Sequence, residues 1–467
     1  MKKLMALLTA CAVLLSAGAY SASALDENVT DGDYVYKLVE DGAEVVQYNG
    51  SKEELVIPDT FGGKPVVSIG KKAFRSADVV KVTVPKTVKR FCDHAFSDCR
   101  ELKQINLPEG LEVIESFALH RTKITKLNFP DSLKEIGGGA FEESFKIKSV
   151  KFGKGLKRIP KGAFDLTAIK SVTIPDNIEH IGTGAFSECK SLTTVKIGKG
   201  VSSIGYEVFS WNKKLSKLTV DKRNKYFVSE GNVLYNKKKT RLIYYSLNRK
   251  NKSFTAPKSL KKLDGGVFRG NQYIEKVTLT DKIKKIPYDA FYGAAKLKKI
   301  NLPKSLEVIE GSAFRDCRIN SVKIPKNVKK IGYCAFSYSK IKKLEFEKGA
   351  RPEIDEEAFS GNDFTEVTYL PFDCGNYRFT ECRKLRKVNF TSDVTYIYND
   401  FINSGLKEIT IPDTVKVITD HALGFEEHFG LDGGYTKIKD FVIKGSKGSV
   451  AETYANEYGI KFVDVNK

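Results

Sequence analysis

The sequence predicts a solenoid, in which one short unit is repeated along the chain and each turn stacks on the next. Three observations predict it: an Ala-Phe pair that recurs at a nearly fixed interval, a strand-like apolar pattern before each pair, and a small or hydrogen-bonding residue three positions after it. With the second residue of each pair as the marker of a turn, the steps are 22 or 23 residues, apart from one of 59 and one of 20. A fixed period in this range is typical of solenoids, because a single unit cannot bury its own apolar face. The markers are Phe74, Phe96, Leu119, Phe141, Phe164, Phe186, Phe209, Phe268, Phe291, Phe314, Phe336, Phe359, Phe379, Phe401 and Leu423.

Residues 297–317 show the unit in full. Apolar residues before the marker follow the spacing L-x-x-I-x-L, and Ile300 and Leu302 alternate with polar residues as in a short strand with one face inward. Pro303 ends this strand because it has no backbone N–H to donate. A second apolar pair follows before the marker Phe314, so each turn is expected to bury residues from three places.

The position three residues after each marker from Phe74 to Phe401 is Cys, Asn, Ser, Thr or Ala, as at Cys99, Cys317 and Asn362. Together the pattern L-x-x-I-x-L-P-x-x-L-x-x-I-x-x-x-A-F-x-x-C resembles the BspA-type leucine-rich repeat family of bacterial secreted or surface proteins. The resemblance implies an α+β repeat fold, a curved and mostly β leucine-rich repeat solenoid. It also implies that this position is the Asn/Cys column, whose side chains bond backbone groups in the bend, and that the protein adheres to or binds a partner at the cell surface.

The predicted domain organisation is one long solenoid with two caps. We expect a signal peptide at 1–24, an N-terminal cap at 25–58, the solenoid at 59–445 and a C-terminal cap at 446–467. The step of 59 residues indicates an insert at about 221–252, which reads as a β-hairpin projecting from the solenoid.

Both caps have local signals. Alternating segments at 34–39 and 44–48 predict a β-hairpin that covers the first turn. At the other end, Ser449 and Glu452 predict a capping box, Gly459 a helix end, and 460–463 a closing strand. A long loop is expected at 424–435, followed by a strand at 438–443.

The N-terminus indicates export. Two lysines, an apolar run over 4–19 and the small residues 22–24 have the three regions of a secretory signal peptide. An alternative interpretation of Leu8 to Cys11 is a lipid-attachment sequence with Cys11 as the anchor. No later segment has the roughly 18 apolar residues that a membrane span requires. The expected location is secreted or associated with the cell surface.

The net charge indicates the class of partner, and the cysteine positions indicate buried thiols. The chain has a formal net charge of +21, which becomes +19 without Lys2 and Lys3, so an acidic glycan or wall polymer is a natural partner and nucleic acid is expected only nonspecifically. Cysteines in the predicted ladder column are expected to be buried thiols, although Cys317 and Cys334 lie on successive turns and their pairing stays open. There is no C-x-x-C pair, and no metal or cofactor is expected.

The candidate binding surface is the concave sheet, because the residues between the apolar strand positions are expected to form exposed columns along one long sheet. These positions are rich in basic residues, with few acids and almost no aromatic rings. The candidate ligand-binding residues are Lys103, Lys126, Lys148, Lys151, Lys170, Lys196, Lys298, Lys299, Lys323, Lys342, Lys343, Arg386 and Lys387. The alternative is that lysine is simply the solvated residue that keeps a strand surface from aggregating.

The insert supplies a second candidate surface. Trp211, Tyr235, Tyr244 and Tyr245 lie in or beside it among many lysines, and aromatic residues together with basic ones suit a binding surface. Insertions in repeat proteins also often lie on the binding face. The alternative is that these rings pack the hairpin onto neighbouring turns.

No catalytic constellation is recognisable. The five histidines do not converge, and H-E-x-x-H, G-x-S-x-G and G-x-x-x-x-G-K-[ST] are absent from the sequence. The hypothesis is therefore a non-enzymatic, exported binding or adhesion protein that recognises a protein or a polyanionic partner. The alternative is a structural coat protein held by charge on the producer's own anionic wall.

Overall fold

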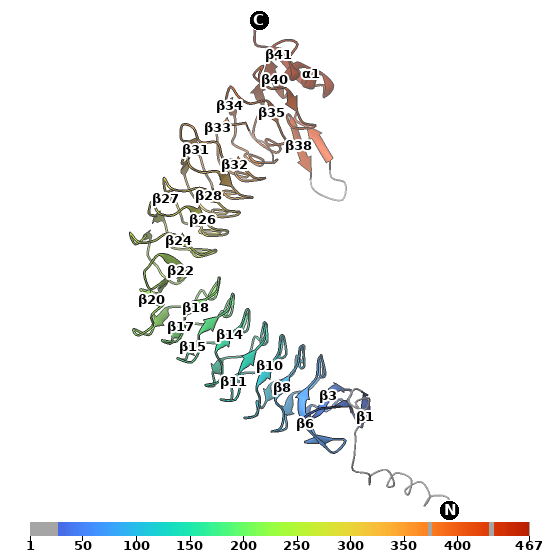
Figure 1. Ribbon diagram of the computed structural model, residues 1–467. Coiled ribbons are helices and arrows are strands. Elements are labelled where there is room, and N and C mark those ends of the chain that lie inside the picture. The colour runs from blue at the N-terminus through green and yellow to red at the C-terminus, as the bar shows by residue number, and fades with distance from the viewer. Residues whose placement is uncertain (1–26, 372–375, 429–433, 467) are drawn as a thin grey trace, which may run out of the picture. The chain divides into compact units, whose positions relative to one another are not determined.

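The computed structural model describes residues 27–371, 376–428 and 434–466. The expected signal peptide, Cys11 and Cys374 lie outside the described residues. Two compact units are distinguished, one formed by the chain up to Ile147 with Phe152–Leu156, the other by Lys148–Lys151 and the chain from Lys157 on. Each unit is a stack of turns that follow one another in sequence order (Figure 1).

Each turn contributes two short strands, which form two columns in each unit. In the first unit, the first column comprises β4 (Glu54–Val56), β7 (Lys81–Thr83), β9 (Gln104–Ile105) and β11 (Lys126–Asn128), and the second comprises β3 (Gly42–Tyr48), β6 (Lys64–Ile69), β8 (Arg90–Phe91), β10 (Val113–Ile114) and β12 (Glu135–Ile136).

In the second unit the first column is longer. It comprises β13 (Ser149–Lys151), β15 (Ser171–Ile174), β17 (Thr194–Ile197), β19 (Lys217–Val220), β23 (Ser253–Thr255), β25 (Lys276–Thr278), β27 (Lys299–Asn301), β29 (Ser321–Ile324), β31 (Lys343–Phe346), β33 (Glu366–Tyr369), β34 (Lys387–Phe390), β36 (Glu408–Thr410), β40 (Val442–Gly445) and β41 (Lys461–Asp464). The second column comprises β14 (Arg158–Ile159), β16 (His180–Ile181), β18 (Ser203–Ile204), β22 (Arg241–Tyr245), β24 (Lys262–Leu263), β26 (Lys285–Ile286), β28 (Val308–Ile309), β30 (Lys330–Ile331), β32 (Glu353–Ile354), β35 (Tyr396–Ile397) and β37 (Val417–Ile418).

The expectation of one long sheet was wrong. In the second unit the first column forms separate ladders, such as β15-β17-β19, β23-β25-β27 and β29-β31. Strands of two to four residues share only a few hydrogen bonds, so a small shift between two turns is enough to separate them. Where β27 and β29 do not pair, the second column continues, because Val308 of β28 pairs with Lys330 of β30.

The caps combine predicted and unpredicted elements. The predicted N-terminal hairpin is formed by β2 (Tyr34–Val39) and β3, and β1 (Val29–Asp31) adds to it. β3 then pairs in parallel with β6, so the hairpin covers the first turn, beside which β5 (Thr60–Phe61) pairs with β6. Near the C-terminus the expected loop contains the hairpin β38 (Phe425–His428) and β39 (Gly434–Lys437), and the next strand begins at Val442 rather than at residue 438.

The C-terminal cap is the helix α1 (Val450–Glu457) followed by β41. The expected capping box is not formed, because Glu452 bonds the residue before the N-cap Ser449. The Glu452 carboxylate accepts a hydrogen bond from the Gly448 N–H at 2.6 Å, whereas the Ser449 hydroxyl makes no capping bond. Gly459 has a φ of +59° just beyond the helix, a conformation that favours glycine and ends the helix there.

The insert does not project from the solenoid as expected. It forms a three-stranded antiparallel sheet of β20 (Phe227–Glu230), β21 (Val233–Asn236) and β22. β22 also pairs in parallel with β24, where Leu242 lies opposite Leu263. The last strand of the insert is therefore a member of the second column.

The core is a stack of the marker side chains. From Phe268 to Phe359 consecutive rings lie nearly parallel with centroids 4.9 to 5.4 Å apart. All of these rings are buried. Offset-stacked rings at this spacing stabilise each other beyond the burial of their area.

Backbone hydrogen bonds join each marker loop to the next. In the turn of Phe164, the N–H groups of Gly162, Phe164 and Leu166 donate to carbonyls of the following turn at 3.0 to 3.1 Å. Leu166 adopts a φ of +58° to do so, at a cost of about 1 to 2 kcal/mol for a residue with a Cβ. The same three positions donate in the turn of Phe268, so this ladder is a regular feature of the fold.

The column three residues after the marker behaves as predicted. Cys99 donates from its thiol to the Phe74 carbonyl at 2.9 Å, and Cys317 to the Phe291 carbonyl at 3.2 Å. The buried Asn362 side chain makes four hydrogen bonds to the backbone. Its amide donates to the Phe336, Phe359 and Ser360 carbonyls at 2.9, 2.8 and 3.3 Å, and its Oδ1 accepts from a backbone N–H at 2.9 Å. Six cysteines of the described chain, Cys317 and Cys334 among them, are free thiols.

One pair of turns departs from the Ala-Phe pattern. The position before the marker is Ala or Val in the other turns, but Arg378 and Asp400 occupy it in two consecutive turns. Both side chains are fully buried, and Arg378 Nη1 lies 2.6 Å from Asp400 Oδ2. The Tyr369 hydroxyl donates to the same carboxylate oxygen at 2.6 Å, so a buried ion pair replaces two small side chains.

Candidate functional site

The outward positions of β13, β15, β17 and β19 form a surface that consists only of lysine, serine and threonine. Each turn presents three such positions around one inward residue, and the strand register places them in rows, with Thr173 opposite Lys196 and Lys196 opposite Thr219. We call this surface the Lys/Ser/Thr face. Its twelve residues are Lys148, Ser149, Lys151, Lys170, Ser171, Thr173, Thr193, Thr194, Lys196, Ser216, Lys217 and Thr219, all exposed except Thr194, which is half-buried.

The five lysines of this face have no acidic partner. Within the described residues, none of them lies within 4.0 Å of a carboxylate oxygen. The nearby acids pair elsewhere: Asp176 with Lys199 at 3.4 Å, and Asp221 with Arg223 at 2.8 Å. Hydrogen bonds from Arg223 hold the pKa of Asp221 well below its usual range, so it stays ionised and paired.

Later turns of the second unit carry lysines whose charge is already balanced. Four predicted lysines have carboxylate partners: Lys298 with Glu275 at 3.2 Å, Lys323 with Glu347 at 4.0 Å, Lys343 with Glu345 at 2.5 Å and Lys387 with Glu366 at 3.4 Å. The hydrogen bond from Lys298, together with one from Lys252, lowers the pKa of Glu275. These turns therefore offer a partner less free positive charge than the Lys/Ser/Thr face.

The remaining predicted basic residues fall into two groups. Lys299 and Lys342 are exposed, and no carboxylate of the described chain lies within 4.0 Å of them, whereas Arg386 donates to backbone carbonyls such as that of Gly405 at 2.8 Å. Lys103 and Lys126 are exposed on the first column of the first unit, without an ion pair among its described residues. They lie on the first unit and do not belong to the Lys/Ser/Thr face.

The aromatic residues of the insert are mostly buried. Tyr235, Tyr244 and Tyr245 have relative exposures of 5%, 7% and 1%, and the Tyr245 ring packs against Phe268 with centroids 4.8 Å apart. Burial follows from the pairing of β22 with β24, which places the sheet of the insert on the core. The structure therefore supports the packing interpretation for these three rings, and only Trp211 is partly exposed.

A narrow pocket marks the place where the insert interrupts the marker ladder. Glu207, Phe209 and Trp211 occupy the donor positions of their turn, but among the described residues their N–H groups find no carbonyl in the turn of Phe268. The two facing loops instead line a cavity of about 20 Å³, room for about one water molecule. The sequence signalled this break only as the step of 59 residues.

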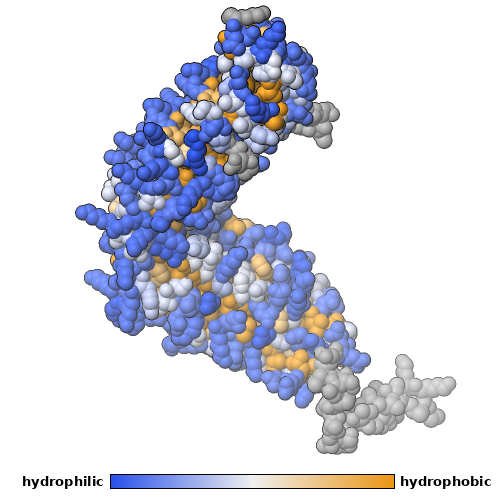
Figure 2. Space-filling view, turned by 45° about the horizontal axis from the view of Figure 1, so that its top comes forward, coloured by the Kyte–Doolittle hydropathy of each residue, from blue (hydrophilic) through white to orange (hydrophobic). Residues whose placement is uncertain are grey.

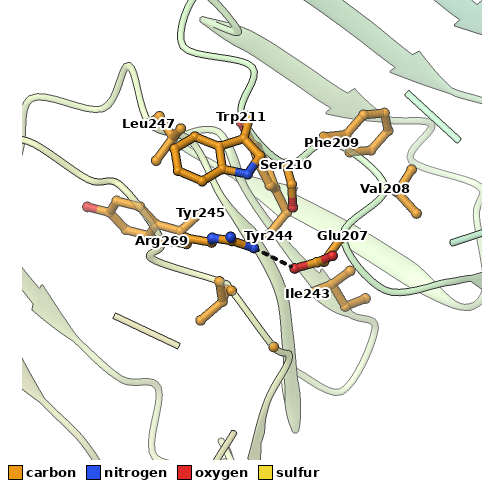
Figure 3. A pocket seen from close by; sticks show the side chains of 13 residues that line it. Glu207, Val208, Phe209, Ser210, Trp211, Ile243, Tyr244, Tyr245, Leu247 and Arg269 are labelled. Atoms are coloured by element: carbon orange, nitrogen blue, oxygen red, sulfur yellow. Dashed lines mark hydrogen bonds and ion pairs between the residues drawn. The ribbon is translucent and has the colours of Figure 1, made fainter. Parts of the chain in front are cut away.

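Arg269 closes this junction pocket. Its guanidinium carbon lies 4.9 Å from the centroid of Trp211, and its Nη1 lies 3.5 Å from Glu207 and 3.2 Å from Asp289. Figure 3 shows the guanidinium directed at Glu207 with the indole ring beside it. The Arg269 guanidinium already has carboxylate partners and a stacked ring. We therefore interpret the pocket as a packing contact between two runs of turns.

The face of the molecule shown in Figure 2 is mostly polar. On the face shown in Figure 2, hydrophilic residues cover most of the area and hydrophobic ones appear as patches between them. Among the described residues, no cluster of His, Cys, Asp or Glu is arranged to hold a metal ion. The described chain also contains no helix long and apolar enough to cross a bilayer.

Comparison with known proteins agrees with this geometry. The family model described as BspA type leucine-rich repeat region matches residues 67–186, 157–246, 239–365 and 308–429. The chain belongs to this family. The curated proteins contain no match.

Two solved structures illustrate the shared leucine-rich repeat solenoid. That of the pneumococcal vaccine antigen PcpA is 21% identical, with a TM-score of 0.52 and coverage of 94% of this chain and 98% of the other. That of a leucine-rich cell surface protein from Faecalibacterium prausnitzii A2-165 is also 21% identical, with a TM-score of 0.56 and coverage of 79% and 96%. At this level of identity the likeness concerns the fold, and this BspA-type protein must be interpreted from its own surface.

Proposed function

We propose that this BspA-type protein is an exported, non-catalytic binding protein that holds an anionic polymer at the cell surface with its Lys/Ser/Thr face. The observation that carries the proposal is the absence of any acid among the twelve outward positions, while its five lysines keep their charges unpaired within the described chain. Family membership and the cell-surface description of a structural neighbour support the location.

The geometry suits a chain-like anion. Neighbouring strands lie about 4.8 Å apart, so lysines two turns apart present charge at intervals of about 10 Å along the column. The hydroxyl groups of Ser149, Ser171 and Thr173 can donate hydrogen bonds to phosphate, sulfate or carboxylate oxygens. Those of Thr193, Ser216 and Thr219 already donate to backbone carbonyls. Lysine acts here as a point charge that tolerates variation in the orientation of the anion.

The test compares two variants of residues 25–467 with the same change in charge. The face variant replaces Lys148, Lys170, Lys196 and Lys217 by Gln, and the control variant replaces the paired Lys298, Lys323, Lys343 and Lys387 by Gln. Both are measured by biolayer interferometry on wall teichoic acid and on mucin, at low and physiological salt.

The face variant is expected to bind about a thousandfold more weakly at low salt, because a lysine near an anionic surface contributes about 1 kcal/mol. The control variant should change by less than about tenfold, since its lysines are already neutralised in place. Equal losses in the two variants would contradict the proposal. Equal, salt-labile binding of the wild-type protein to every polyanion would favour the alternative, a structural coat on the producer's own wall.

A further inference from the structure

A second, wider pocket lies in the second unit, at the edge where strands of the second column run into the marker loops. It has a volume of about 460 Å³, within the range of small-molecule sites. Its lining includes Tyr206, Lys262, Gly265, Lys285, Tyr288 and Glu310. None of these residues belongs to the Lys/Ser/Thr face.

Two exposed tyrosine rings flank a position without a side chain. Tyr206, Gly265 and Tyr288 each lie three residues before the marker, in three consecutive turns. The two tyrosines have relative exposures of 48% and 59%, which is high for large aromatic residues. Gly265 lines the pocket without a side chain, and a Cβ there would lie 3.3 Å from the Tyr288 carbonyl oxygen, a close approach to the next turn.

The Tyr288 ring is held against the backbone of the next turn. A Cβ at Gly311 would lie 3.4 Å from two of its ring carbons, so the absence of a side chain there lets the ring lie close to the main chain. The Tyr288 N–H also donates to Glu310 Oε2 at 2.9 Å. One edge of the pocket is therefore held by contacts within the chain.

Positive charge lies beside the rings. Lys262 Nζ lies 5.6 Å from the Tyr206 ring centroid and donates to its hydroxyl at 3.4 Å. Arg241 lies 5.3 Å from the same centroid and is bound to the buried Asp264 at 2.7 Å. Lys285 is neutralised by Glu310 at 2.5 Å, whereas Lys262 has no carboxylate partner within the described chain.

We propose that this pocket binds a sugar unit that carries a negative charge, such as a uronate. The C–H face of a sugar ring can pack on an exposed tyrosine, because an aromatic face is apolar and carries partial negative charge. The ammonium group of Lys262 can pair with the carboxylate of the same sugar. Rings and a free lysine in one pocket fit such a ligand better than either a neutral sugar or a simple anion.

The experiment is isothermal titration of the full mature chain with tetragalacturonate, and with maltotetraose as the neutral probe. The wild-type protein should bind tetragalacturonate and not maltotetraose. Tyr206→Ala, Tyr288→Ala and Lys262→Gln should each weaken binding about tenfold.

Two controls separate this site from other causes. Tyr333 occupies the same column with 49% exposure but lies beside Glu357 and outside the pocket, so Tyr333→Ala should bind like the wild-type protein. Because the Lys/Ser/Thr face also suits carboxylates, Tyr288→Ala is repeated in the face variant with four Gln substitutions, where it should again weaken binding of tetragalacturonate about tenfold. The proposal is overturned if the wild-type protein does not bind tetragalacturonate, if it binds maltotetraose equally well, or if Tyr333→Ala loses as much affinity as Tyr288→Ala.

Discussion

Replacing Arg378 by Ala should strongly destabilise the turns around it. The substitution leaves the Asp400 carboxylate fully buried without its cation, and removing one partner of such a pair costs about 3 to 5 kcal/mol. Asp400→Ala should lower the free energy of unfolding by a similar amount, since it leaves the Arg378 guanidinium buried without its carboxylate. If the two effects were independent, the free energy of unfolding of the double variant would fall by their sum, about 6 to 10 kcal/mol.

The double variant should lose much less, about 2 to 4 kcal/mol, because no unpaired charge remains. What remains is the cavity left by the two side chains and the Tyr369 hydroxyl without its acceptor. It also restores the alanine that most other turns carry at this position. Long repeat arrays need not unfold in one step, so the suitable assay is native-state hydrogen exchange of the ladder amides of Phe359 and Phe379. This reasoning would be refuted if the double variant lost as much free energy of unfolding as the two single variants lose together.

The penalty of Arg378→Ala should also depend on pH. Burial raises the pKa of Asp400, and Arg378 opposes that rise, so the variant raises it further. A carboxyl group whose pKa is raised by folding stabilises the fold at low pH and loses this contribution as pH rises through its folded pKa. The difference from the wild-type protein should therefore shrink as pH falls through the raised pKa of Asp400, and Asp400→Ala should show no such trend.

Two further predictions concern the column after the marker. Asn362→Ala removes four buried hydrogen bonds and should lower the free energy of local opening, measured by hydrogen exchange, by about 2 to 4 kcal/mol. Cys382→Ala, which loses one long thiol bond, should lower it by only about 1 kcal/mol; similar losses would contradict the assigned roles. Burial raises the pKa of Cys99 and of Cys189 to about 12, so iodoacetamide at pH 8 should label them only in urea, and mass spectrometry showing label on the native protein would contradict their burial.

Much of the fold could be predicted because the same apolar and small residues recur at the same positions in many turns. The bonds of Cys99 and Asn362 to marker carbonyls follow from one column read along the chain. The separate ladders could not be predicted. Strands of two to four residues gain or lose their pairing through small shifts between turns, and the apolar pattern of the sequence does not reflect such shifts. The burial of Tyr245 depends on the pairing of β22 with β24, which the insert sequence does not specify.

The candidate site was predicted only in part. Lys170 and Lys343 were both predicted as outward lysines of the first column, and the structure distinguishes them by the carboxylate of Glu345 beside Lys343. Such pairing depends on the conformations of long side chains. The pocket between Tyr206 and Tyr288 was missed, although reading the position three residues before each marker as a column shows the two rings on either side of a glycine.

The regular marker ladder has a consequence for how the gene can change. Where the ladder is regular, a loop donates the same three bonds to its successor, as the loop of Phe291 does to that of Phe314, so the successor needs only to present the same carbonyls. Excision of one period, such as residues 292–314, would place the loop of Phe336 directly after that of Phe291 with equivalent acceptors. Recombination between repeats can thus lengthen or shorten the molecule in whole turns, whereas the turns that face each other at the insert depend on its specific packing and cannot be exchanged in this way.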